Sequence, residues 1–325
     1  MISAAISAPP TFDPYNADGT YRVLAIAYPF VATDLVNPLN FINEQTNVIN
    51  ANRVLTNAAL IYKPIREITV KISGGVENAD DRTDNYTTRN YFLSIGRASV
   101  STSQFISLLN ENTISFDKTF KKIHSISALG GFTYQDFVST SLSGSGNGFL
   151  SDVTETSGLS SATTPGIPSS SYSKSVLLSY LARVNYGLKD KYLATISVRR
   201  DGSSRYSDGN KWSYFPSAAL AWRIANEGFM KNSKFISDLK LRASWGFTGS
   251  QAISPYATLN QLSTNRTVFN DALYTAFAPG TRLPGNLKWE TTEQKDIGID
   301  FAILNNRLLF TADYYIKNTR DLLNN

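Results

Sequence analysis

The sequence lacks residue patterns that several classes of protein require. It contains no cysteine and a single histidine, His124, which excludes a disulfide framework, thiol catalysis and cysteine-ligated zinc. Its 31 basic and 26 acidic residues are spread along the chain without a basic block, so nucleic acid is not an expected partner. No segment approaches the roughly 18 consecutive apolar residues that a membrane-spanning helix needs. Any membrane crossing must therefore use β-strands.

Residues 176–224 show the pattern that the rest of the chain repeats. Apolar and polar side chains alternate with a period of two, which predicts β-strands with two different faces. A short link at 188–190 and a longer polar loop at 201–211 divide the segment into three such strands. Aromatic residues stand near the ends of the apolar face, as they do in strands that face lipid. That face comprises Leu178, Tyr180, Ala182, Val184, Tyr186, Tyr192, Ala194, Ile196, Val198, Trp212, Tyr214, Ala218, Leu220, Trp222 and Ile224.

Similar alternation recurs near residues 68–76, 239–248, 297–303 and 308–316. The connections are short near 63, 117, 188, 225 and 304, and long from about 78, 138, 201 and 249, so short and long links alternate. An up-and-down barrel crossing a membrane predicts this rhythm, because its turns are short on one side and its loops long on the other. We expect a bulge at Pro216, which cannot donate a ladder hydrogen bond. The fold class is therefore all-β, an antiparallel up-and-down transmembrane β-barrel with about ten strands of a larger barrel.

Three segments carry a family resemblance: 177–230, which contains RRDGSSR, 238–251, and 286–323, which contains LKWETT. Weaker echoes lie at 36–47 and 130–135. On these residues the chain resembles the barrel of TonB-dependent outer-membrane transporters of the SusC/RagA type. The resemblance implies a barrel of about 22 strands with a plugged lumen, a SusD-like surface lipoprotein and the TonB complex as partners, and an oligosaccharide or peptide as cargo. It implies active nutrient import across the outer membrane of a Gram-negative bacterium.

We expect residues 1–325 to be a single partial barrel domain, with 1–47 mostly loop and 48–319 in strand hairpins. The expected fragment is the middle of a longer protein, with the plug domain and terminal strands outside it. Two other functions remain open, a passive ten-stranded pore and a soluble β-sandwich adhesin or lectin. An enzyme is not expected, because no nucleophile, base or metal cluster is apparent, and no cofactor is predicted.

Several residues could contact a ligand, although a structural role is favoured for His124, for the acidic segment 77–84 and for the arginines of segment 199–205. His124 begins a strand, and we expect a wall or turn residue. The acidic residues of segment 77–84 could hold calcium, but a solvated loop is favoured. The arginines of segment 199–205 could contact anionic lipopolysaccharide or cargo. Lys240 and Arg242 could touch a plug, because charges on an inward face need water or partners. The complete set is His124; Glu77, Asp80, Asp81 and Asp84; Arg199, Arg200, Asp201 and Arg205; Lys240 and Arg242; and the loop aromatics Tyr256, Phe269, Tyr274 and Phe277, which could stack on sugars.

Overall fold

A computed structural model describes residues 13–23, 37–230 and 235–322, together with Ile6, Thr11, Ile26 and Ser233. Much of the expected 1–47 loop lies outside these residues. The chain divides into two compact units, one of residues 1–55, 77–106 and 138–173, the other of residues 56–76, 107–137 and 174–325. That the whole chain is one barrel domain stays a prediction. Among the described residues, no helix is long and apolar enough to cross a membrane.

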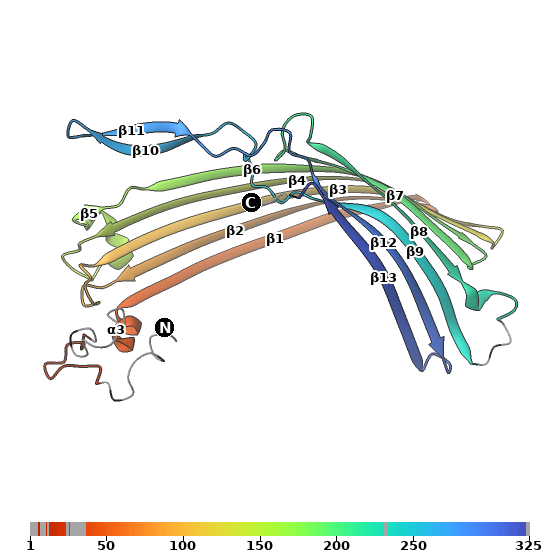
Figure 1. Cartoon of the computed structure of the whole chain (residues 1–325), viewed down its shortest axis with the longest axis horizontal. Helices are drawn as coiled ribbons and strands as arrows, with labels where there is room; N and C mark the ends of the chain where they lie inside the picture. Colours follow the sequence, from red (N-terminus) through yellow and green to blue (C-terminus); the bar gives the residue numbers. More distant parts are fainter. Residues whose placement is uncertain are drawn as a thin grey trace. The chain divides into compact units, whose positions relative to one another are not determined.

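Antiparallel strands dominate the described part of the chain (Figure 1). A short helix, α3 (Pro38–Asn43), precedes the first strand. The strands are β1 (Gln45–Ile65), β2 (Ile68–Thr87), β3 (Arg97–Phe120), β4 (His124–Asn147), β5 (Thr164–Pro165), β6 (Ser169–Leu188), β7 (Tyr192–Ser203), β8 (Trp212–Arg223), β9 (Ile236–Ser250), β10 (Leu262–Phe269), β11 (Ala272–Pro279), β12 (Glu290–Ile303) and β13 (Leu308–Arg320), with 3₁₀ turns η1 (Glu155–Ser161) and η2 (Ile224–Asn226).

The sheet order is β1-β2-β3-β4-β6-β7-β8-β9-β12-β13, with β5 paired to β4, while β10 and β11 form a separate hairpin. The ten strands on this path, counted over the described residues, agree with the predicted number and with the predicted up-and-down order. Strand neighbours in the sheet are neighbours along the sequence, except where β5 and the β10–β11 hairpin intervene. This order follows from the short links, since a tight turn places consecutive strands side by side in opposite directions.

The cross-strand register confirms the two faces read from the sequence. Tyr180 pairs with Arg200, and Val184 pairs with Ile196, so the even-numbered positions of β6 and β7 share one side of the sheet. Ile196 pairs with Ala218, which extends the same side onto β8. The apolar positions of β9, β12 and β13 continue this side, because Leu220 pairs with Ala243 and Ala243 with Ile297, which pairs with Tyr314. We call it the apolar face, and the opposite side the polar face.

The short turn between β6 and β7 illustrates how the links reverse the chain. The Lys191 N–H donates to the Leu188 carbonyl oxygen at 3.0 Å. Lys189 and Asp190 both have a φ of 53°. Positive φ at both central residues is what a type I′ turn requires, and the twist of that turn matches the twist of paired strands. Asp tolerates this left-handed conformation better than most residues, which suits Asp190 to the position.

Three segments predicted as long loops contain strand instead. In the 78–103 segment β2 continues to Thr87 and β3 begins at Arg97; in the 138–175 segment β4 continues to Asn147 and β6 begins at Ser169; and the 249–286 segment contains the β10–β11 hairpin. The strand extensions escaped detection because polar residues occupy both of their faces, which removes the alternation signal. Their side chains hydrogen-bond across strands, as Ser141 does with Ser171 and Ser143 with Ser169, at 2.7 Å each.

The bulge expected at Pro216 does not occur. Pro216 pairs with Val198 in an unbroken β7–β8 register. On its other side, the β8–β9 pairing runs only from Arg223 to Ser217. Pro216 therefore stands just past the end of that ladder, where a missing N–H removes no hydrogen bond to β9. The strand accommodates the proline by its position and needs no extra residue.

Among the described residues, buried hydrophobic side chains form one small cluster in each unit. In the first unit Tyr86, Ala98, Phe149 and Ala162 pack together. In the second unit the loops after β7 and β9 bring Tyr206, Phe215, Ile253 and Trp289 together. Tyr206 stacks on Trp289 with 5.1 Å between ring centroids, and Phe215 meets the same indole edge-on at 5.7 Å. Burial raises the pKa of Tyr206 to about 12. This second cluster fixes the loops at the ends of β7, β8, β9 and β12.

Candidate functional site

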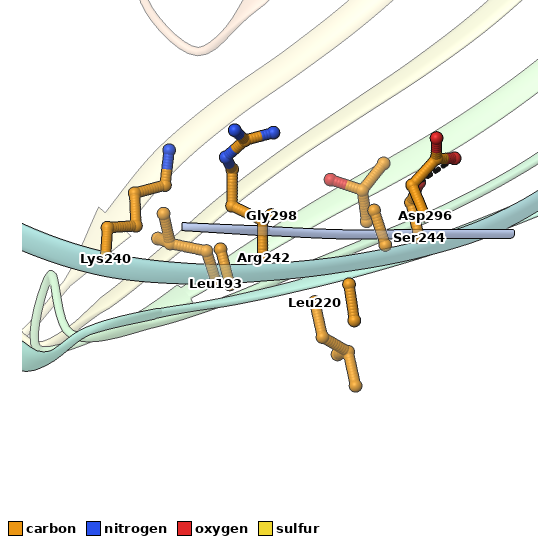
Figure 2. A pocket seen from close by; sticks show the side chains of 11 residues that line it. Leu193, Leu220, Lys240, Arg242, Ser244, Asp296 and Gly298 are labelled. Carbon is orange, nitrogen blue, oxygen red and sulfur yellow. Dashed lines mark hydrogen bonds between the residues drawn. The ribbon is translucent and has the colours of Figure 1, made fainter. Parts of the chain in front are cut away.

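The polar face of β9, β12 and β13 carries a group of charged side chains that contact one another. Alternation along β9 places Lys240, Arg242 and Ser244 on this face, and alternation along β12 places Asp296, Gly298 and Asp300 there. The register sets Lys240 opposite Asp300 and Ser244 opposite Asp296. Figure 2 shows Lys240, Arg242, Ser244 and Asp296 projecting from one side of the strands and Leu220 from the other.

Arg242 is the centre of a charge network that joins three strands. Its Nε and Nη2 donate to the two carboxylate oxygens of Asp300, both at 2.9 Å. The same Nη2 lies 2.9 Å from a carboxylate oxygen of Asp313 on β13. Lys240 adds a longer contact of 3.6 Å to Asp300. The bidentate geometry uses the planar guanidinium fork, which a lysine could not reproduce.

Gly298 makes the link to β13 possible. It lies between Arg242 and Asp313 in the register, so the arginine must reach across it. A β-carbon at this position would collide with the Asp313 carboxylate and lie only 2.9 Å from Arg242 Nη2. The glycine therefore leaves the space that the ion pair occupies.

A shallow pocket of about 270 Å³ lies beside this network. Its polar wall includes Ser244, whose hydroxyl donates to Asp296 at 3.0 Å, and its floor includes Leu193. Gln294 donates to the other oxygen of Asp296 at 2.7 Å. The arrangement offers hydrogen-bond donors and acceptors to a polar partner in water. Its lining contains no histidine to activate the Ser244 hydroxyl, so it lacks the serine–histidine–carboxylate arrangement of an acyl-transfer or hydrolytic centre.

The opposite side of the sheet, over β8, β9 and β12, is apolar and open. Leu220 is 64% exposed, and Ile297 is 67% exposed. Near the end of β12 this face also carries Glu293 and Lys295, which pair with each other at 3.2 Å. Trp245 donates its indole N–H to Glu293 at 2.8 Å. The strands thus separate an apolar side from a charged side within a single layer.

His124 begins β4 and contacts the neighbouring strand. Its Nδ1 lies 2.8 Å from the Tyr186 hydroxyl, and the two rings stack with centroids 6.0 Å apart. Within the described ranges, no group of three His, Asp or Glu residues could hold a metal ion. The imidazole packs against Tyr186 on the neighbouring strand β6, which is the structural role expected for it.

The acidic segment 77–84 is strand and not the expected loop. Alternation sends Asp80 and Asp84 to one side and Glu77 and Asp81 to the other. Each of three carboxylates has its own neighbour: Glu77 pairs with Arg53 at 2.6 Å, Asp84 with Arg82 at 2.8 Å, and Asp80 accepts from Asn78 at 2.5 Å. The carboxylates therefore do not converge as calcium ligands do.

The arginines of 199–205 separate into three environments. Arg199, on the polar face, donates to Asp201 at 2.7 Å and to the Ser179 hydroxyl at 3.1 Å. Arg200 points to the apolar face, where its guanidinium lies over the Trp212 ring at 4.4 Å. Arg205 points toward the buried cluster of the second unit and donates to the carbonyl oxygen of Ile253, a member of that cluster, at 2.9 Å. They do not form one anion site.

The four loop aromatics do not form one sugar-stacking platform. The Tyr256 hydroxyl accepts a hydrogen bond from the Lys174 backbone N–H at 2.9 Å. Phe269 and Tyr274 share one face of the β10–β11 hairpin and meet edge-on at 6.5 Å. Phe277 lies on the other face of that hairpin and is 67% exposed.

Comparison with known proteins identifies the family. The model of the family described as "TonB dependent receptor-like, beta-barrel" matches residues 6–325. The chain belongs to this family. It is 33% identical to TonB-dependent receptor P3 of Formosa agariphila over 99% of this chain and 32% of that protein. It is 43% identical to TonB-dependent receptor SusC of Bacteroides thetaiotaomicron over 46% of this chain and 16% of that protein.

A solved structure gives the same result for the fold. The structure described as that of the RagAB peptide transporter superposes with a TM-score of 0.86 and 25% identity, covering 96% of this chain and 35% of that chain. The resemblance to the SusC/RagA type is thus confirmed, and so is the all-β barrel fold class. The chain spans about a third of the length of the relatives that match it along nearly its whole length.

Proposed function

We propose that this chain forms part of the wall of an outer-membrane transporter that imports oligomeric nutrients. Its apolar face contacts lipid, and its polar face lines the water-filled interior. The observation that carries the proposal is the separation of the two faces in a chain of this family. Hydrocarbon cannot satisfy charged side chains, whereas water and an enclosed plug can. The network centred on Arg242 is then an interior surface, where it can contact the plug or passing cargo.

The proposal includes the direction of the strands. Short turns such as Leu188–Lys191 lie on the periplasmic side, and the longer connections, including 204–211 and 251–289, lie outside. Outer-membrane barrels have this asymmetry of turns and loops. The loop cluster of Tyr206, Phe215, Ile253 and Trp289 is then a rigid base for the external surface.

The full-length protein is proposed to act with a SusD-like surface lipoprotein and to take energy from the TonB complex. One similar structure is described as a peptide transporter, and one relative is named SusC. The cargo is proposed to be an oligosaccharide or a peptide. The charged lumen accepts either, because both classes of molecule form many hydrogen bonds.

Uptake by cells that carry the full-length protein tests the proposal. Cells should accumulate labelled oligosaccharides or peptides of one class, the protein should fractionate with the outer membrane, and a protonophore should abolish uptake. Uptake that continues in the presence of the protonophore would indicate a passive pore. A full-length protein that is soluble without detergent would contradict the membrane assignment and favour a β-sandwich adhesin.

A further inference from the structure

One cation on the apolar face has aromatic neighbours but no acidic partner. Arg200 pairs with Tyr180 on β6 and with Tyr214 on β8, so all three side chains project from the same side. No carboxylate of the described residues lies within ion-pair distance of it, and its buried Nε has no hydrogen-bond partner there. The nearby Asp201 points to the polar face, where it pairs with Arg199.

The aromatic rings around Arg200 form a built platform. Its guanidinium carbon lies 4.4 Å from the centroid of the Trp212 ring and 5.3 Å from that of Tyr214. Trp212 also stacks on Tyr180, with centroids 6.1 Å apart and an interplanar angle of 28°. These contacts occupy the flat side of the guanidinium and stabilise its charge. Because Nε is buried, the terminal Nη groups are the N–H donors that can meet an acceptor in the plane.

Gly202 allows Trp212 to take this position. The two residues pair in the β7–β8 register. A β-carbon on Gly202 would lie 2.7 Å from the indole ring. Because the glycine has no side chain, the indole lies flat across β7 and reaches both Arg200 and Tyr180. The platform therefore depends on a feature of the strand as well as on the aromatic residues themselves.

The position of Arg200 along β7 indicates which anion it could bind. Arg200 stands near the end of β7 that leads into the 204–211 connection, away from the Leu188–Lys191 turn. Toward that turn the same face is apolar, with Val198 and Ile196 next in line. If the proposed orientation holds, the cation lies where the acyl chains of the outer leaflet meet their headgroups. The anions at that level are the phosphates of lipopolysaccharide.

We propose that Arg200, held by Trp212, Tyr214 and Tyr180, binds a phosphate group of outer-leaflet lipopolysaccharide. A guanidinium and a phosphate form paired, charge-assisted hydrogen bonds, which is the geometry that the free edge of Arg200 offers. This inference rests on the proposed outer-membrane location. It adds a specific lipid site on the outside of the wall, separate from the Arg242 network on the polar face.

The test measures lipid binding by the purified full-length protein in detergent. Bisphosphorylated lipid A and chemically dephosphorylated lipid A are titrated separately, and bound lipid is counted by native mass spectrometry. The wild-type protein should prefer the phosphorylated lipid by about tenfold, the effect expected of a charge-assisted hydrogen bond. Arg200→Gln should reduce this preference to near one, and Arg200→Lys should give an intermediate value.

Arg183→Gln is the matched control, because Arg183 lies on β6 and points to the opposite face. It removes the same charge and should keep the wild-type preference. The preference is a ratio measured on a single protein, so a partial loss of folded material does not alter it. An unchanged preference in Arg200→Gln, or no preference in the wild type, would overturn the proposal.

Two further measurements separate the possible sources of failure. Displacement of lipid A by millimolar inorganic phosphate would show that the site recognises free phosphate, and the lipid assignment would be wrong. Membrane fractionation tests the location independently. A protein found in the outer membrane without a phosphate preference refutes only the lipid site, whereas a protein absent from that membrane refutes the proposed function.

Discussion

Replacing Ala243 with arginine tests the assignment of the two faces. Ala243 is in the middle of β9 (Ile236–Ser250) and pairs with Leu220 on one side and Ile297 on the other. Both neighbours are more than 60% exposed on the apolar face, with values of 64% and 67%. Ala243→Arg therefore places a guanidinium in the centre of the band that we assign to lipid.

The expected cost follows from the depth of the site. An arginine on the lipid side of a barrel at the bilayer midplane costs about 2–4 kcal/mol. Since about 1.4 kcal/mol corresponds to a factor of ten, the folding equilibrium should fall by roughly 30-fold to 700-fold. Urea unfolding of the full-length protein in lipid vesicles measures this difference, with the outer-membrane yield as a second readout.

Ser244→Arg is the matched control for this experiment. It introduces the same side chain one residue further along β9, on the polar face, where Asp296 lies 3.0 Å from the serine hydroxyl. The new guanidinium can pair with that carboxylate in water, so the free energy of unfolding should change by less than about 1 kcal/mol. Equal losses for the two variants would refute the face assignment.

Three other changes have defined outcomes. Gly298→Ala should separate Arg242 from Asp313 and lower the free energy of unfolding by about 1 kcal/mol, as measured by urea unfolding. The same substitution in an Asp313→Asn background should cause a smaller loss, because the ion pair is already absent there. Phe215→Ala should cost about 3 kcal/mol in the same assay, because a buried ring that packs on an indole is lost; a loss below about 1 kcal/mol would contradict the packing. Hydrogen bonds, chiefly from Lys191, lower the pKa of Glu227 to about 2, so its carboxylate stabilises the fold above its ordinary pKa of 4.5 and loses that effect as the pH falls through 2. Glu227→Gln should therefore lower the thermal midpoint at pH 7, and the difference from wild type should shrink below pH 4.5; a difference independent of pH would refute the role of the charge.

The faces of the sheet could be predicted from the sequence because one side is apolar. Val184, Ile196 and Leu220 alternate with polar residues, and an offset of one residue would turn each of them to the other side. The same signal placed Lys240 and Arg242 on the polar face. The bonds that Arg242 forms could not be read in this way, because Asp300 and Asp313 lie 58 and 71 residues further along the chain, and only the register of three strands brings them together.

Other features left no periodic signal. Ser141 and Ser143 lie in the last part of β4 (His124–Asn147), which is mostly polar on both sides and therefore resembles a loop in composition. The acidic stretch near Asp80 resembles a loop in composition for the same reason. In the sequence Gly298 looks like an ordinary strand glycine and Gly202 like part of the 201–211 loop, and the role of each depends on a side chain that crosses from a neighbouring strand. Such roles follow from cross-strand pairs and not from local sequence.

The order of strands in the sheet has a consequence for folding. Most strands pair with the strand that the chain supplies next, and tight turns such as Leu188–Lys191 close some of those pairs over a few residues. Contacts close in sequence form faster than distant ones, because little loop entropy is lost before each pair forms. The sheet can therefore grow by one hairpin at a time, with each finished strand serving as the template for its successor. The step from β9 to β12 is different, because the 251–289 connection must be spanned before β12 can pair. That step is expected to be the slowest in the assembly of this part of the wall.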